Sequence, residues 1–137
     1  LLTLNKQGVT YEGLELLVHM KNLIIADDHN VVREALSELL QSRGEFSIVG
    51  QAADGEELIN LLKSNHPDLV IMDMEMPRVG GVEALERLKV GENGQKVPVL
   101  VLSANENPAS VRAALKAGAR GYVPKHAKSD ELEFAIK

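Results

Sequence analysis

The chain has 137 residues, 45% of them hydrophobic and 26% charged, which are the proportions of one ordinary globular domain. It contains no cysteine, which excludes disulfides and thiolate metal sites and fits a reducing cytosol, and no apolar run approaches the roughly 20 residues that span a bilayer. A net charge of −5 and the absence of tryptophan argue against a nucleic-acid backbone, or a platform for stacked bases, as the partner of this segment.

The first 19 residues differ from the rest. They show no clear hydrophobic period, no positive n-region and no small-residue cleavage pattern, so they do not predict a signal peptide. Met20-Lys21-Asn22 is typical of a natural start, and His19-Met20 is compatible with a cloning junction. We therefore expect residues 1–19 to be an extension introduced by cloning. The alternative is a short native extension in which residues 11–18 form a helical turn or two.

From residue 20 onward, short apolar runs alternate with amphipathic segments. The apolar runs, each predicted to be a strand, are residues 23–26, 48–52, 69–72, 99–102 and 121–123. The segments between them carry apolar residues at helical spacing: Val32, Leu36, Leu39 and Leu40; Leu58, Leu61 and Leu62; Val82, Leu85 and Leu88; Val111, Ala114 and Leu115. Five such units predict an α/β fold, a five-stranded parallel sheet with helices on both faces.

Capping residues predict where the helices begin and end. Helices are expected to begin at the N-caps Asp54 (in a capping box with Glu57), Asn107 (with Pro108 at N1) and Ser129, and to end at Gly44, Gly91 and Gly118. Residues 91–94 are the most loop-like stretch. Since only about two turns follow Ser129, the domain predicted over residues 20–137 is expected to be truncated within its last helix.

Polar side chains follow most of the predicted strands. Asp27 and Asp28 follow the first strand, Asp73 the third and Ser103 the fourth, and Lys125 comes shortly after the fifth. Asp54, after the second strand, is already explained as a helix cap. Because ligands of open α/β sheets bind beyond the carboxyl ends of the strands, these groups are expected to meet at one edge.

These residue types suit phosphoryl chemistry. Adjacent carboxylates without thiols or paired histidines select a hard cation, and Mg²⁺ is the natural candidate. The three aspartates carry a formal charge of −3 and Lys125 carries +1, so one Mg²⁺ would neutralise the remaining −2. Asp73 could then form an aspartyl phosphate, with the Ser103 hydroxyl donating to a phosphoryl oxygen. The structural alternatives are that Asp73 caps a loop, that Asp27 and Asp28 cap a helix, and that Ser103 bonds the next loop.

Four segments carry a resemblance to a known family. They are Ile25-Ala26-Asp27-Asp28-His29, Asp73-Met74-Glu75-Met76-Pro77 with Gly81, Ser103-Ala104, and Gly121-Tyr122-Val123-Pro124-Lys125. On these, residues 20–137 resemble the receiver domain of two-component response regulators. Residues 49–55 and 117–122 look most like the subfamily with a C-terminal helix-turn-helix (LuxR-type) output domain. Many members have a cis-bonded proline directly after the lysine, whereas His126 stands there in this chain.

The resemblance implies roles around the acids. Asp73 would take a phosphoryl group from the phosphohistidine of a histidine kinase. Asp28, Asp73 and the backbone carbonyl of Glu75 would bind Mg²⁺ directly, and Asp27 would act through a metal-bound water. His29, beside the acid pair, is expected not to be a ligand.

The resemblance also implies which residues would respond to phosphorylation of Asp73. Ser103, with Ala104, would be the switch hydroxyl that binds the phosphate, Tyr122 the switch aromatic that turns inward, and Lys125 a contact to the phosphoryl group. The implied fold is flavodoxin-like with strand order 2-1-3-4-5. The protein would be cytoplasmic, with a phosphorylation-linked homodimer and no nucleic-acid or membrane contact through this segment.

Two other functions stay open. An aspartate-nucleophile phosphatase of the haloacid-dehalogenase type shares these groups, but that resemblance would place the nucleophile in an Asp-x-Asp motif after the first strand. A receiver-like module that only mediates protein contacts is the other, and the intact acid cluster argues against it. We expect a signalling switch that is not an enzyme beyond its own Mg²⁺-dependent phosphorylation and dephosphorylation, and that controls a transcriptional output domain absent from this chain.

Overall fold

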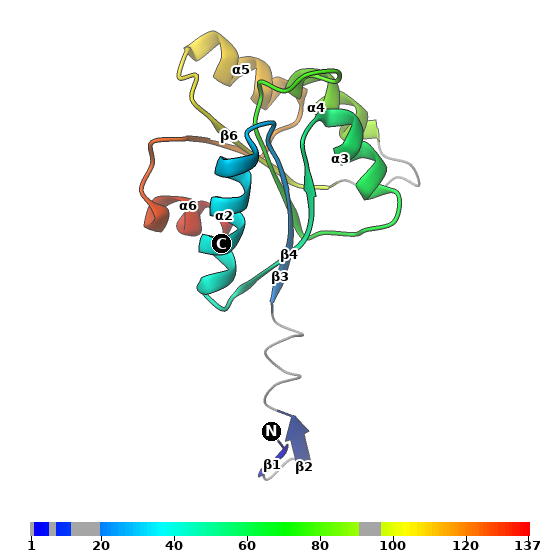
Figure 1. Cartoon of the computed structure of the whole chain (residues 1–137), viewed down its shortest axis with the longest axis vertical. Coiled ribbons are helices and arrows are strands. Elements are labelled where there is room, and N and C mark those ends of the chain that lie inside the picture. The colour runs from blue at the N-terminus through cyan, green and yellow to red at the C-terminus, as the bar shows by residue number, and fades with distance from the viewer. Residues whose placement is uncertain (1, 6–7, 12–19, 91–96) are drawn as a thin grey trace.

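Figure 1 shows the protein as a computed structural model, which describes residues 2–5, 8–11, 20–90 and 97–137. From residue 20 the elements are β3 (Lys21–Ala26), α2 (Asn30–Ser42), β4 (Phe46–Ala52), α3 (Gly55–Leu62), β5 (Leu69–Met72), α4 (Gly81–Val90), β6 (Val99–Ser103), α5 (Pro108–Ala117), β7 (Gly121–Pro124) and α6 (Ser129–Ile136). The loop predicted at residues 91–94 and most of the segment 11–18 lie outside the described residues. No helix within the described ranges is both long and apolar enough to cross a bilayer.

The five predicted strands form one parallel sheet in the order β4-β3-β5-β6-β7. This is the expected order 2-1-3-4-5, counted from residue 20, and the fold prediction is confirmed. The chain runs from β3 outward to β4 and then returns to β5 on the other side of β3, so the strand order reverses between β3 and β5. The ends of these two strands are therefore adjacent: the Asp73 backbone N–H donates to the Ala26 carbonyl at 2.9 Å.

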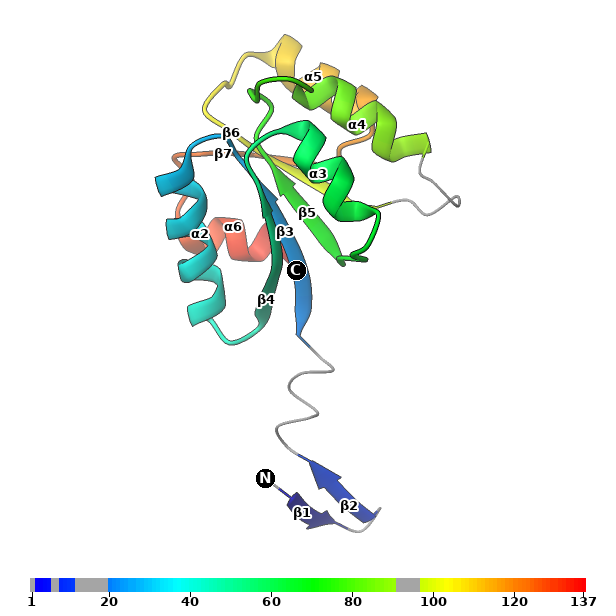
Figure 2. The same cartoon turned by 45° about the vertical axis from the view of Figure 1, so that its right-hand side comes forward.

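The core has two layers, one on each face of the sheet. Figure 2 shows α2 and α6 on one face and α3, α4 and α5 on the other. Side chains alternate along each strand, so Ile24 joins Leu58 and Leu85 in one cluster, while Ile25 joins Leu40 in the other. Burial on both faces explains why the strands are continuous apolar runs rather than alternating ones.

Some apolar residues of the helical pattern lie at the margin of the core. Val32, Leu39, Val82 and Leu115 keep more than a third of their surface exposed. An apolar stripe about 100° wide covers more of a helix than its contact with the sheet, so its outermost members remain accessible to water.

The predicted capping box of α3 is present in a slightly shifted form. The Asp54 carboxylate accepts a hydrogen bond from the Glu57 backbone N–H at 2.8 Å, and the Glu57 carboxylate accepts one from the N–H of Ala53, one residue before the N-cap. At α5, the Asn107 side chain accepts from a first-turn N–H, and Gly118 ends the helix in the left-handed region at φ 116°.

The prediction that Ser129 caps α6 is wrong by one residue. The helix already begins at Ser129, and its N-cap is Lys128, which makes no side-chain capping hydrogen bond. The Ser129 hydroxyl instead accepts a hydrogen bond from the Arg43 guanidinium at 3.1 Å. The contact with the end of α2 occupies the hydroxyl that would have capped the helix.

Residues 2–5 and 8–11 form a pair of antiparallel strands that the sequence pattern did not predict. β1 (Leu2–Asn5) pairs with β2 (Gly8–Tyr11), and the two strands form a sheet of their own. Tyr11 therefore ends a strand, not the helical turn considered for residues 11–18. That residues 1–19 derive from cloning stays a prediction.

Candidate functional site

The predicted site residues gather at the carboxyl ends of β3, β5, β6 and β7, here called the carboxyl edge. Asp27 and Asp73 are each 4% exposed, and Ser103 is fully buried. Lys125 and Asp28 reach the same place with partly exposed side chains. Buried carboxylates are rare unless they are paired, so the pairing at this edge decides what the site can do.

Lys125 connects the two buried aspartates. Its Nζ lies 3.0 Å from Asp27 Oδ2 and 3.0 Å from Asp73 Oδ2. The Lys125 backbone N–H donates to the Ser103 carbonyl at 2.9 Å, which holds the loop after β7 against the end of β6. No cis peptide bond occurs among the described residues, and His126 after the lysine does not move the lysine away from the acids.

Asp27 and Lys125 shift each other's pKa. Burial raises the pKa of Asp27, but the hydrogen bond from the His29 backbone, together with the hydrogen bond and charge of Lys125, outweighs burial and leaves this pKa below its ordinary value. Burial lowers the pKa of Lys125, but the hydrogen bonds and charges of Asp27 and Asp73 leave it above its ordinary value. Both groups are therefore charged at neutral pH.

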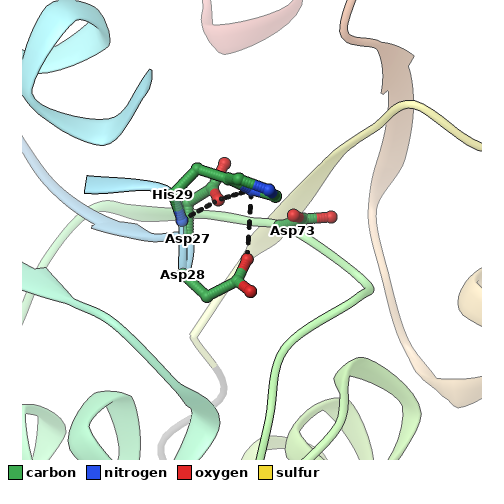
Figure 3. Close-up of side chains that lie close together, drawn as sticks. All are labelled: Asp27, Asp28, His29 and Asp73. Carbon is green, nitrogen blue, oxygen red and sulfur yellow. Dashed lines mark hydrogen bonds and ion pairs between the residues drawn. The ribbon is translucent and has the colours of Figure 1, made fainter. Parts of the chain in front are cut away.

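Figure 3 shows the acid cluster with His29. Asp27, Asp28, His29 and Asp73 each offer one ligand atom within 4.8 Å of the others. His29 Nδ1 lies 3.1 Å from Asp27 Oδ1 and 3.2 Å from Asp28 Oδ1. The N-cap of α2 is His29, without a side-chain capping bond, so neither aspartate caps that helix.

The donor set fits Mg²⁺. Three carboxylates supply hard oxygen ligands, and with Lys125 as their close cation they keep a formal charge of −2. A divalent cation would offset that charge. The imidazole of His29 adjoins this set, and its ring is 63% exposed.

The contacts of Asp73 bear on the two roles considered from the sequence, a phosphoryl acceptor and a loop-capping acid. Its Oδ1 accepts a hydrogen bond from the Glu75 backbone N–H at 3.2 Å, which is what a loop-capping acid would do. Its Oδ2 faces Lys125, which a loop cap does not require. Glu75 itself is exposed, and its main chain lies in the loop directly after Asp73.

The predicted switch residues are joined to each other through Asn105. The Ser103 hydroxyl accepts from the Asn105 backbone N–H at 3.1 Å, as expected of a hydroxyl that bonds the next loop. The Tyr122 hydroxyl donates to the Asn105 carbonyl, and the Tyr122 ring, half-buried, packs against the core. Ala104, between Ser103 and Asn105, is exposed.

Arg33 is a site residue that the sequence reasoning missed. Its Nη1 donates to the Asp27 carbonyl at 2.7 Å, and its Nε donates to the Gln51 side chain at 3.1 Å, so it ties the end of β3 to β4. The available signal was its place in the first turn of the helix after the acid pair, where a long side chain can reach back to the strand end.

The fold and the site define a doubly wound α/β domain with an acidic centre where the strand order reverses. The family model of the response regulator receiver domain matches residues 23–137. The transcriptional regulatory protein DegU of Brevibacillus brevis is 38% identical over 115 residues, which cover 84% of this chain and 48% of DegU. The chain belongs to the response regulator receiver domain family.

Solved structures agree with this membership. The signal receiver domain of the putative response regulator NarL from Mycobacterium tuberculosis superposes with a TM-score of 0.80 at 30% identity, covering 86% of this chain and 94% of that one. A DNA-binding response regulator of the LuxR family from Staphylococcus aureus gives 0.78 at 28% identity, covering 85% and 96%. These matches support the LuxR-type subfamily. The chain spans about half the length of the curated relatives it matches.

Proposed function

We propose that this domain is a phosphorylation-controlled signalling switch that accepts a phosphoryl group on Asp73 from a histidine kinase. The observation that supports it best is the position of Asp73, buried at the strand-order reversal with Oδ2 3.0 Å from Lys125 Nζ. In the transfer, an Asp73 oxygen forms the new bond to phosphorus. The bond from phosphorus to the kinase histidine breaks, and its electron pair stays on that nitrogen.

The neighbouring residues have separate roles in this proposal. Asp28, Asp73 and the Glu75 carbonyl would hold Mg²⁺ directly, with Asp27 acting through a water, and the bound ion would offset negative charge on the phosphoryl oxygens. Lys125, already at Asp73, would turn its ammonium to the phosphoryl group and offset part of the same charge. Arg33 and the Asp27 main chain would keep the acid pair aligned.

The switch residues would carry the signal. A phosphoryl group on Asp73 would attract the Ser103 hydroxyl, with the Ala104 N–H beside it, which breaks the Ser103–Asn105 hydrogen bond. Asn105 would then release Tyr122, whose ring can turn further inward. The result would be a shifted equilibrium at the face formed by α5, β7 and α6, which would change self-association or contact with an output domain.

The relatives suggest what that output is. DegU and DesR are named transcriptional regulatory proteins, and each is about twice as long as the match. We infer a cytoplasmic protein in which this domain regulates a LuxR-type transcriptional output domain, with a sensor histidine kinase as partner and a homodimer as the phosphorylated form.

The test is phosphorylation by a small donor. The protein is incubated with Mg²⁺ and acetyl phosphate or phosphoramidate, and its intact mass is measured, with Asp73→Asn and the exposed Asp68→Asn in parallel. We expect a Mg²⁺-dependent gain of one phosphoryl group in the unaltered protein and in Asp68→Asn, and none in Asp73→Asn. A missing gain in the unaltered protein would favour the contact module, and sustained turnover of p-nitrophenyl phosphate would favour a phosphatase.

A further inference from the structure

Asp54 has a second partner besides the helix that it caps. It is 3% exposed, and its Oδ1 accepts from the Glu57 backbone N–H. Its Oδ2 lies 3.2 Å from Arg78 Nε, in the loop between β5 and α4. Both oxygens of this buried carboxylate are therefore engaged, one by its own helix and one by the loop that begins at Asp73.

Arg78 holds an unfavourable backbone conformation. Its φ is +64°, and it is the one non-glycine residue with positive φ among those the structure describes. L side chains crowd the backbone in this left-handed region, so a residue stays there only when its surroundings hold it. The ion pair with Asp54, and a longer one of 3.6 Å between Arg78 and the exposed Glu56, are contacts of the Arg78 side chain that can do so.

The backbone of the same loop also touches the start of α3. A Cβ on Gly55 would lie 2.3 Å from the Val79 carbonyl oxygen, so only glycine permits this close approach. At the other end of the loop, the Gly81 N–H donates to the Met74 carbonyl at 3.1 Å. The segment from Asp73 to Gly81 is thus closed on itself and held against α3.

We propose that the Arg78–Asp54 ion pair, here called the latch, positions the β5–α4 loop and so sets the rate at which Asp73 is phosphorylated. This inference rests on the proposed function. Arg78 and Asp54 are positioning residues that act through the loop. The Glu75 N–H, three residues before Arg78, holds Asp73 Oδ1. A loop that slides away from α3 moves this donor and the Glu75 carbonyl, and both the acceptor and one Mg²⁺ ligand lose their place.

Two substitutions separate the ion pair from backbone and capping effects. Arg78→Gly removes the cation but suits the left-handed backbone, so it relieves strain. Asp54→Asn removes the charge but keeps an oxygen for the Glu57 N–H, so it retains the helix cap. Arg78→Lys keeps the cation and serves as the rescue variant. Glu56→Gln is the matched control, because it removes only the longer, exposed pair.

The measurement is the initial rate of Asp73 labelling by phosphoramidate against Mg²⁺ concentration, at a temperature where circular dichroism shows every variant folded. We expect Arg78→Gly and Asp54→Asn each to label about threefold slower than the unaltered protein, and to need more Mg²⁺ for half-maximal rate. The double variant should be no slower than the slower single one, because both remove the same contact. Arg78→Lys should recover most of the rate, and Glu56→Gln should match the unaltered protein.

The outcomes separate the latch from the proposed function. Labelling of Arg78→Gly at the unaltered rate and Mg²⁺ requirement, or fully additive losses in the double variant, would overturn the latch while leaving Asp73 as the acceptor. Failure of the unaltered protein to label would overturn the proposed function and the latch with it.

Discussion

The two edges of the sheet both carry charged residues, but these residues have different partners. At the amino ends of the strands a cavity of about 320 Å³ is lined by Lys21, Asp68, Arg120 and Lys137 among mostly apolar residues. There the Lys21 Nζ donates to the Ile136 carbonyl at 3.0 Å, and Asp68 accepts from the Asn22 backbone N–H at 2.7 Å. At the carboxyl edge, by contrast, Lys125 lies between two carboxylates of a cluster with a third.

This difference shows what makes one edge a candidate site. At the amino ends, main-chain groups bind the charged side chains of Lys21 and Asp68, whereas at the carboxyl edge three carboxylates and one ammonium leave an excess of negative charge that repels itself. Such repulsion is relieved when a cation binds, so a cluster of this kind is a candidate cation site. Charged residues alone do not distinguish the two edges; their partners do.

The largest expected effect is on the rate of Asp73 labelling, when the lysine at the carboxyl edge is removed and compared with the lysine at the amino ends. Lys125→Met should slow Asp73 labelling by about 100-fold, because it removes a cation that faces the phosphoryl group. Lys21→Met should leave the rate within about twofold. Both are measured by intact mass over time with acetyl phosphate and Mg²⁺. If both variants lost the same fraction of the labelling rate, the position of Lys125 at the carboxyl edge would have no special role in phosphorylation.

Mg²⁺ itself should stabilise the fold through the carboxyl edge alone. At about 100 times its dissociation constant, a ligand that binds the folded state adds about 2.7 kcal/mol to the free energy of unfolding. In Asp28→Asn most of this gain should be lost, while the metal-free variant should be at least as stable as the unaltered protein because like-charge repulsion falls. The amino-edge variant Asp68→Asn should keep the full gain.

Urea unfolding with and without Mg²⁺ measures these gains. An undiminished Mg²⁺ effect in Asp28→Asn would show that the ion binds elsewhere.

The smallest expected effect is on stability, and it comes from the packing around one glycine at each end of the sheet. A Cβ on Gly81 would lie 2.7 Å from the Met74 Cα and carbonyl oxygen, whereas one on Gly121 would meet only the end of the Leu100 side chain, at 2.9 Å. Gly81→Ala should therefore cost about 1–3 kcal/mol of unfolding free energy, and Gly121→Ala less than about 1 kcal/mol. Urea titrations decide this, and the reverse ranking would contradict the structure.

Local patterns predicted the parts that depend on burial and on strand direction. The strand at residues 69–72 was predicted with its observed bounds because it is buried on both faces. The meeting of Asp27, Asp28, Asp73 and Lys125 followed from the rule that parallel strands end at one edge. The N-cap of α6 was misplaced because the arrival of Arg43 from α2 at Ser129 has no signature near residue 129.

The sequence by itself determined the order of the elements, the two-sided core and the set of acids at one edge, because each depends on residues close together in the chain or on the common direction of the strands. Only the tertiary structure decided which charges meet. The contacts Arg78–Asp54, Arg33–Gln51 and Tyr122–Asn105 join separate loops and elements. These contacts form only when the loops pack over the carboxyl edge. Because the two residues of each contact are far apart in sequence, no local sequence pattern predicts that they meet.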